Sequence, residues 1–224
     1  MRLAPPLAVA AIVLTTAAPG ARGQSVDATI DRAVAAWGKV KTVRGTFEQT
    51  VSNQLTSSTA TARGEYAQQR PNLLSIRFTQ PASDAIVSDG KAVWVYLPST
   101  APGQVIKRSA TDRSETPIDL TGAFLDSPRT KYDITAAPAK TVDGHAAHGL
   151  LLIPKPGVSA PFTKATVWVD DDDALIREFD VTEASGISRH VHLTTVEPNA
   201  QVSKSLFAFS MPAGAKIVDQ TKPE

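Results

Sequence analysis

The chain has 224 residues, 42% of them hydrophobic, and carries 23 Lys and Arg against 22 Asp and Glu. A chain of this size and composition can bury a core of its own, so we expect one folded domain. The even charge disfavours nucleic-acid binding, which normally requires a basic excess, and tight electrostatic attachment to a membrane. Cysteine is absent, which excludes disulfide bonds.

The start of the chain has the pattern of a secretory signal peptide. Arg2 gives a basic start, residues 3–18 form an apolar run, and small residues mark a cleavage site before Gln24. A membrane span is the weaker interpretation, because prolines interrupt the run and it is shorter than the roughly 20 residues of a typical span. We therefore expect residues 1–23, ending at Gly23, to be removed and residues 24–224 to form a single soluble domain.

One amphipathic helix is expected at the start of the mature chain. Ser25 is a suitable N-cap, and Gly38 stands where the helical pattern ends. Apolar residues recur at helical spacing and form one face of this helix: Val26, Ile30, Ala33, Val34 and Trp37.

Most of the remaining chain alternates between apolar and polar residues, which is the pattern of half-buried β-strands. In the segment LLSIRF, the side chains of Leu74, Ile76 and Phe78 fall on one face, and Phe47 marks the apolar face of GTFEQTV. Further strands are expected at residues 59–67, 148–154, 164–170, 175–182, 188–196 and 206–212.

Turns and a second helix interrupt these strands. The dipeptides at 89–90 and 143–144 are both Asp-Gly, which favours a β-hairpin between two strand segments. A short helix is expected within residues 116–125, where Thr116 can cap the helix and Pro117 suits its first turn.

These elements predict an antiparallel sheet with helices packed on its apolar face. If the sheet is curved, the helices form a lid over it. The space between the helices and the sheet is then either an ordinary packed core or a cavity, and alternation alone does not separate the two.

No constellation of residues predicts catalysis. The four aspartates at 170–173 lack the glycine and the glutamate of a calcium loop and favour a hairpin turn. His190 and His192 share one face of a strand at a spacing that zinc can use, but no third ligand is evident. Motifs for nucleophilic, nucleotide or zinc-protease sites are absent from the sequence. We expect no enzyme, no metal and no cofactor; a hydrolase that uses His190 or His192 is the least favoured alternative.

Four segments together resemble the LolA family of periplasmic outer-membrane lipoprotein carriers. They are GTFEQ, RPNLLSIRFTQP, IVSDGKAVWVYLP and, near the end of the chain, FAFSMPAGAKIVDQ. The central pair is the most specific, and the resemblance covers nearly the whole mature chain. It implies a mainly β fold with α-helices, namely an unclosed antiparallel β-barrel, or half-barrel, covered by a lid of short helices that enclose an apolar cavity.

The same resemblance implies a function. The protein would be a periplasmic chaperone that binds the acyl chains of lipoproteins released from the inner membrane and delivers them to the outer membrane. Its implied partners are acylated lipoproteins, the inner-membrane lipoprotein-releasing ABC transporter and the outer-membrane lipoprotein receptor; we expect a monomer. The alternative is a periplasmic lipid-binding or sensory module of the same fold. The family's receptor is itself a lipoprotein and needs a cysteine, which this chain lacks.

The resemblance also indicates site residues. The family's lid arginine corresponds to Arg70, because both precede the tripeptide PNL, and Pro71 would fix the backbone at the strand entrance. Arg70 would donate to backbone carbonyls of the helical cover near residues 117–125; the alternative is a solvated arginine. Ala67 and Ile76 stand where family members often have tryptophan, so smaller side chains would line the pocket. The expected acyl-chain pocket, in which Trp94 depends on hairpin register, consists of Val34, Trp37, Phe47, Leu74, Ile76, Phe78, Trp94 and Phe124.

Overall fold

The computed structural model describes residues 25–110 and 120–221, apart from the side chain of Leu120. The expected signal peptide lies outside the described residues. The described helices are α1 (Val26–Gly38), α2 (Leu120–Leu125), α3 (Pro128–Lys131) and the 3₁₀ helix η1 (Lys204–Phe207). The strands are β1 (Thr42–Asn53), β2 (Ser58–Gln69), β3 (Leu73–Gln80), β4 (Ala85–Asp89), β5 (Ala92–Tyr96), β6 (Gln104–Ser109), β7 (Tyr132–Val142), β8 (His145–Pro154), β9 (Lys164–Asp170), β10 (Ile176–Thr182), β11 (Ile187–Pro198) and β12 (Lys216–Asp219).

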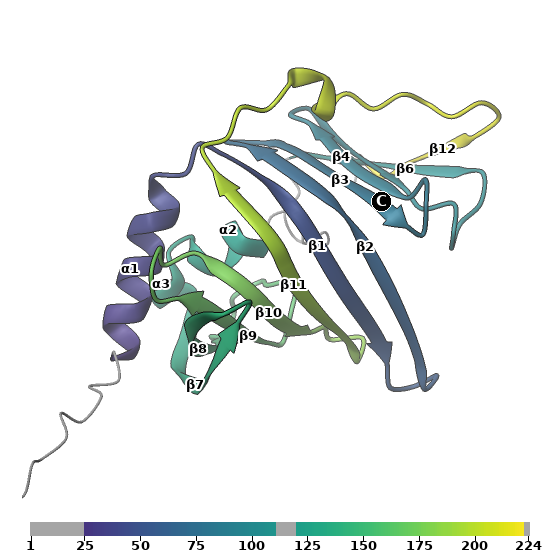
Figure 1. The fold of residues 1–224 in the computed structure, drawn as a ribbon. Coiled ribbons are helices and arrows are strands. Elements are labelled where there is room, and N and C mark those ends of the chain that lie inside the picture. Colours follow the sequence, from purple (N-terminus) through teal and green to yellow (C-terminus); the bar gives the residue numbers. More distant parts are fainter. Residues whose placement is uncertain (1–24, 111–119, 222–224) are drawn as a thin grey trace, which may run out of the picture.

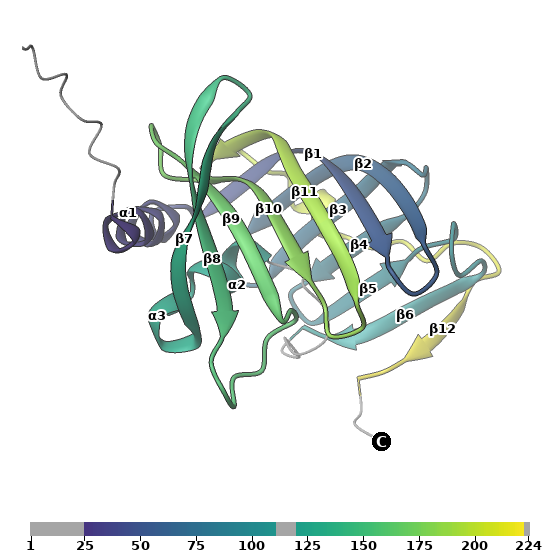
Figure 2. The same cartoon turned by 90° about the horizontal axis from the view of Figure 1, so that it is seen from below.

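All of these strands belong to one sheet in the order β12-β6-β5-β4-β3-β2-β1-β11-β10-β9-β8-β7. Neighbouring strands are antiparallel except β12, which pairs parallel with β6. The end strands β7 and β12 do not pair, and Figure 2 shows them at opposite ends of the curved sheet. The predicted mainly β, unclosed fold is confirmed.

Helix α1 forms where the sequence predicts it. The Ser25 hydroxyl accepts a hydrogen bond from the Ala28 N–H at 3.1 Å, which caps the first turn. The side chains of Ile30, Ala33 and Trp37 are buried, so the helix places its apolar face on the sheet. Figure 1 shows α1 beside α3, on the side of the sheet that carries β7 to β10.

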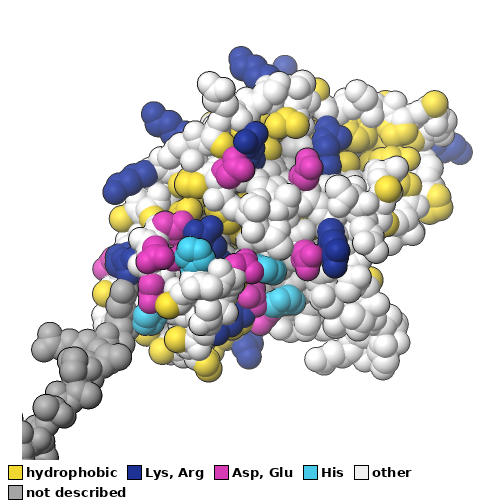
Figure 3. Space-filling model, viewed as in Figure 1, with side chains coloured by type: hydrophobic (Ala, Val, Ile, Leu, Met, Phe, Trp, Pro, Cys, Tyr) yellow, Lys and Arg dark blue, Asp and Glu magenta, His cyan; other side chains and the backbone are white. Residues whose placement is uncertain are grey.

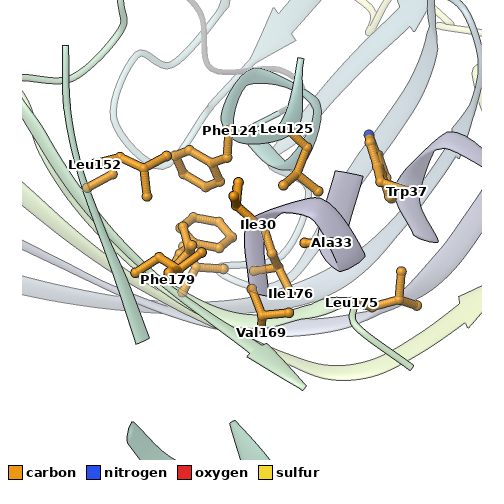
Figure 4. Packing of buried hydrophobic residues seen from close by; sticks show 14 of the residues in the cluster. Ile30, Ala33, Trp37, Phe124, Leu125, Leu152, Val169, Leu175, Ile176 and Phe179 are labelled. Atoms are coloured by element: carbon orange, nitrogen blue, oxygen red, sulfur yellow. The ribbon is translucent and has the colours of Figure 1, made fainter. Parts of the chain in front are cut away.

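The packed core lies between α1, α2 and the half of the sheet formed by β7 to β11. Phe124 of α2 is fully buried and packs against Phe162 and Phe179, with ring centroids 5.5 and 5.3 Å away. Figure 4 shows Phe124, Phe179 and Ile30 meeting within this core. No helix in the described part of the chain is long and apolar enough to cross a membrane.

Both Asp-Gly dipeptides lie in the predicted hairpins. The Asp89 carboxylate accepts hydrogen bonds from the N–H groups of Lys91 and Ala92, each at 2.8 Å. Gly90 and Gly144 have φ of 89° and 85°, a conformation that glycine adopts without steric cost. The turns therefore join β4 to β5 and β7 to β8, as the sequence predicts.

The C-terminal segment differs from the expected strand at 206–212. Its first part is η1, capped by Ser203, whose hydroxyl accepts from the Ser205 N–H. An extended segment without sheet pairing follows, and the chain then forms β12. In Figure 1 this segment crosses over β3 and β4. The expectation of a strand was wrong because the apolar side chains of this segment pack on the sheet from outside instead of extending it. The expected helix at 116–125 is described only from Leu120 onward.

Candidate functional site

An apolar row crosses the inner face of the sheet, which is the face against which α1 packs. Directly opposed residues of an antiparallel pair point to the same face. Opposed pairs lead from β2 through β3, β4 and β5 to β6 and define what we call the apolar row: Tyr66, Ile76, Ile86, Val95 and Ile106. Tyr66 and Ile76 also pack against the core cluster beneath α1, which places the row on the inner face.

The residues of the apolar row are all partly exposed, which separates them from the packed core. On the inner face of β8 to β10, Leu152, Val167 and Phe179 are at most 4% exposed. Helix α1 contacts α2, β7 and β8, so the described helices cover the half of the inner face that carries β7 to β11. The inner face therefore has a packed half and an apolar half that is less covered.

The sheet bends between these two halves. Phe47 of β1 contacts Phe78 of β3 edge to face, with ring centroids 5.5 Å apart, across Gly64 of β2. A Cβ atom at Gly64 would collide with the carbonyl oxygen of Arg77 and with the Phe47 ring. Irregular pairing occurs beside Phe47 and beside Gly64, as expected for bulges that curve a sheet.

Arg70 and Trp37 meet at one end of the inner face. Arg70 lies in the turn between β2 and β3, and its backbone N–H donates to the Lys41 carbonyl at 3.0 Å. Its guanidinium carbon is 4.8 Å from the ring centroid of Trp37 in α1, a cation–π geometry. The predicted bonds to carbonyls near 117–125 fall partly outside the described residues. The contact described for the guanidinium is thus with the first helix of the cover.

Ion pairs hold the helices of the cover together. Arg129 of α3 pairs with Asp27 and Asp31 of α1, and the Nη2–Oδ1 distance to Asp27 is 3.1 Å. The hydrogen bond from Arg129 holds the pKa of Asp31 below its ordinary value. Lys155, after β8, donates to the Arg129 carbonyl at 2.7 Å. The cover is therefore attached to the β7–β8 side of the sheet.

Most of the predicted pocket residues gather on the inner side. Phe47, Trp37 and Phe124 belong to the buried cluster, and Val34, Ile76 and Phe78 pack against it; Leu74 is buried farther along the same face. Whether they bind acyl chains stays a prediction. Four members of the apolar row were not among the predicted pocket residues, although alternation on either side of the β4–β5 turn contains part of the signal: Tyr66, Ile86, Val95 and Ile106.

The placement of Trp94 on the inner face is wrong. Trp94 is opposite Val87, whereas Ser88, which shares a face with Leu74, is opposite Val93. The indole of Trp94 lies on the outer face, stacked on Phe209 with 5.4 Å between centroids. Its Nε1 donates to Asp89 at 2.9 Å. The C-terminal segment covers this side of β5, so a large aromatic residue is stable there.

The four histidines are at least partly exposed to solvent and have carboxylates beside them, and Figure 3 shows histidine and acidic side chains together on the molecular surface. His190 contacts Asp180 and His192 contacts Asp143, each at 2.6 Å. His145 could share a metal ion with Asp170 and Asp172, but the buried Asp170 carboxylate already accepts from the Arg177 side chain at 2.9 Å. These contacts give each of these histidines a carboxylate partner and do not require a catalytic role.

Comparison with known proteins gives a consistent result. Residues 38–210 match the sequence model of the family described as outer membrane lipoprotein carrier protein LolA. An outer-membrane lipoprotein carrier protein of Glaesserella parasuis serovar 5 is 33% identical over 175 residues, which cover 78% of this chain and 77% of that protein. A protein with the same description from Actinobacillus pleuropneumoniae serotype 7 is 29% identical over 211 residues, which cover 94% and 91% of the two chains.

A solved structure shares the fold at lower sequence similarity. An uncharacterized conserved protein from Thermus thermophilus superposes with a TM-score of 0.53 at 13% identity. The match covers 88% of this chain and 100% of that one. This likeness concerns the fold alone.

Proposed function

This chain belongs to the LolA family of outer membrane lipoprotein carrier proteins, and from this premise we propose that it is a periplasmic lipoprotein carrier. It takes up the acyl chains of lipoproteins released from the inner membrane and delivers them to the outer membrane, without a chemical step. The observation that carries the proposal is the apolar row, whose side chains remain partly exposed on the inner face of a curved sheet.

The energetics of lipoprotein transfer require such a surface. Each methylene buried away from water is worth about 0.8 kcal/mol, so acyl chains with some forty methylenes cost on the order of 30 kcal/mol when exposed. Free diffusion through an aqueous compartment is therefore excluded. On a protein surface that resembles the bilayer interior, the free energy of transferring the acyl chains from the membrane is close to zero. Small changes in the position of the cover can then shift the equilibrium between retention and release of the cargo.

The proposal includes the compartment and the partners. Residues 1–23 act as the export signal, and residues 24–224 act as one soluble, monomeric carrier domain. The carrier receives cargo from an inner-membrane ABC transporter that releases lipoproteins, and it passes the cargo to an outer-membrane receptor. The same apolar surface on the inner face would bind the acyl chains during both uptake from the transporter and delivery to the receptor.

Arg70 and Pro71 are proposed to close the cover. The contact between the Arg70 guanidinium and the Trp37 ring supports this role, because it links the β2–β3 turn to α1. A cation–π contact at an exposed site is worth about 0.5–1 kcal/mol. Such a contact can bias the position of α1 without locking it, as a carrier that must release its cargo requires.

The test is to purify the full chain from its native envelope and to identify bound molecules by mass spectrometry. The proposal predicts a co-purified acylated polypeptide. Free lipid without polypeptide would support the lipid-binding or sensory module instead. A protein without bound lipid that also fails to take up a purified triacylated lipoprotein from detergent would overturn the proposal.

A further inference from the structure

Trp37 carries a buried hydrogen-bond donor without an acceptor. The residue is 6% exposed, and its indole Nε1 has no hydrogen-bond partner among residues 25–110 and 120–221. The chain has two other tryptophans, and both are bonded: Trp94 donates to Asp89 at 2.9 Å and Trp168 donates to the Pro138 carbonyl at 3.0 Å. Buried indole N–H groups normally find a partner, so the exception on the inner side calls for an explanation.

The surroundings of Trp37 hold the donor in place. One face of the ring is in contact with Arg70, and the residue is part of the same buried cluster as Ile30 and Ala33 of α1. Figure 4 shows the indole at one side of this cluster, with its nitrogen directed away from Leu175. A rotation of the ring toward another acceptor would give up the contact with Arg70. The N–H is therefore held in one orientation, without an acceptor in the described part of the chain.

The position of Trp37 indicates which acceptor could reach it. Its contact with Arg70 places Trp37 at the β2–β3 turn, where the less covered apolar half of the inner face meets α1. Arg70 is exposed beside it, at the end of β2. A molecule that enters between Arg70 and Trp37 and continues toward the apolar row would have its polar end near Arg70 and its first buried atoms near Trp37.

We propose that Trp37 is a specificity residue whose indole N–H donates to the carbonyl oxygen of an ester- or amide-linked acyl chain. The inference rests on the proposed function. An acyl chain is apolar except for the carbonyl at its head, and that oxygen accepts one hydrogen bond from a donor such as an indole N–H. The bond fixes how deeply the chain enters. It also favours acyl chains over alkyl chains of the same length, which leave the buried donor unpaired.

The experiment compares two probes that differ only in the carbonyl. One is a lipopeptide with two ester-linked hexadecanoyl chains, and the other carries two ether-linked hexadecyl chains. Dissociation constants are measured for the full mature chain and for Trp37→Phe, which keeps an aromatic ring for Arg70 but removes the N–H. The wild type should bind the ester probe about tenfold more tightly than the ether probe, and Trp37→Phe should bind both alike. The control is Trp168→Phe, whose lost bond to Pro138 lies away from the inner face; it should keep the tenfold preference.

Nuclear magnetic resonance supplies a readout that does not depend on a variant. The three tryptophans give three indole N–H signals, and the Trp37 signal should move downfield with the ester probe but not with the ether probe. Equal binding of both probes by the wild type, or an unmoved Trp37 signal in the ester complex, would overturn the inference and leave the carrier function standing. Failure of the wild type to bind either probe would overturn both.

Discussion

The guanidinium of Arg70 lies over the indole ring of Trp37, 4.8 Å from its centroid, and this contact joins the turn after β2 to the end of α1. Through this contact the arginine of the RPNL segment touches the helical cover. It lies at the border between the packed half and the less covered half of the inner face. A change in this contact should therefore alter how the cover moves more than it alters the core.

Replacement of Arg70 by leucine is the first test of the cover. The variant loses the cation–π contact but keeps an apolar stem, so the fold should survive and α1 should be held less firmly. We expect normal loading from inner-membrane vesicles and poor transfer to the receptor, because the closed empty state no longer favours release. The two steps are measured separately. Arg63→Leu is the matched control, since Arg63 pairs with Glu48 on the outer face. Normal transfer by Arg70→Leu would show that Arg70 is only a solvated turn residue.

Ile86 tests the apolar row. It is partly exposed in the middle of the row, so a charge there can stay hydrated while it disrupts an apolar binding surface. Ile86→Glu should weaken binding of a triacylated lipopeptide at least tenfold, with a loss of unfolding free energy of about 1–2 kcal/mol. Leu74→Glu should unfold the protein instead, because Leu74 is 6% exposed. Leu55→Glu, at an 85% exposed turn position, is the control that should change neither quantity.

Gly45 tests the close approach of β1 and β11. A Cβ atom there would overlap the Thr195 carbonyl oxygen, which belongs to the opposing backbone and cannot move aside cheaply. Gly45→Ala should lower the unfolding free energy by about 2–4 kcal/mol. Gly38→Ala is the matched control, because a Cβ at the end of α1 meets no atom within 4 Å; it should stabilise the protein by about 0.5–1 kcal/mol. Urea denaturation measures both, and equal stability of Gly45→Ala and the wild type would contradict the strand geometry.

The sequence predicts part of this site and misses the rest for identifiable reasons. In the segment around Leu74, Ile76 and Phe78, polar residues alternate with apolar ones and fix which side chains face inward. In the segment around Trp94, apolar residues follow one another from Ala92 to Tyr96. Side chains still alternate between the two faces of the strand, but the sequence does not indicate which set faces inward. The pairing of Val93 with Ser88 determines that Val93 faces inward and Trp94 outward. On the outer face, Phe209 of the C-terminal segment, which is distant in sequence, covers the Trp94 ring.

The contact of Arg70 with Trp37 shows a second limit. The LolA resemblance singles out Arg70, and helical periodicity singles out Trp37 as a buried residue. Neither pattern contains information about the distance between the two side chains, because this depends on where α1 crosses the sheet. The missing acceptor of the Trp37 indole is likewise a property of the packed structure. Local patterns therefore predict the parts of the site, and their relationship follows only from the fold.

The carboxylate of Asp170 should make the stability of the fold depend on pH in the acid range. The residue is 1% exposed at the end of β9. Burial alone would raise its pKa, but the Asp172 N–H at 2.7 Å and the Arg177 side chain at 2.9 Å donate to it and hold the pKa below its ordinary value. The unfolded chain therefore binds this proton at a higher pH than the folded chain does. The stabilisation is complete above about pH 5 and is lost as the pH falls below about 4 toward the folded pKa.

Asp170→Asn should show that this carboxylate contributes to stability at neutral pH but not in acid. The variant leaves the largely buried Arg177 without its inner partner, so at pH 7 its unfolding free energy should be lower than that of the wild type by roughly 3–5 kcal/mol. As the pH falls below about 4, the unfolded wild-type chain binds a proton at Asp170 that the folded chain resists, so the wild type loses stability and the difference should narrow. Asp172→Asn is the control, because its side chain is 82% exposed and its backbone N–H remains; its difference should be small at every pH. Urea denaturation at intervals between pH 7 and pH 3 measures all three proteins. An equally large gap between the wild type and Asp170→Asn at pH 3 and pH 7 would mean that the neutral carboxyl and the carboxylate stabilise the turn equally, and the ionic account of Asp170 would be wrong.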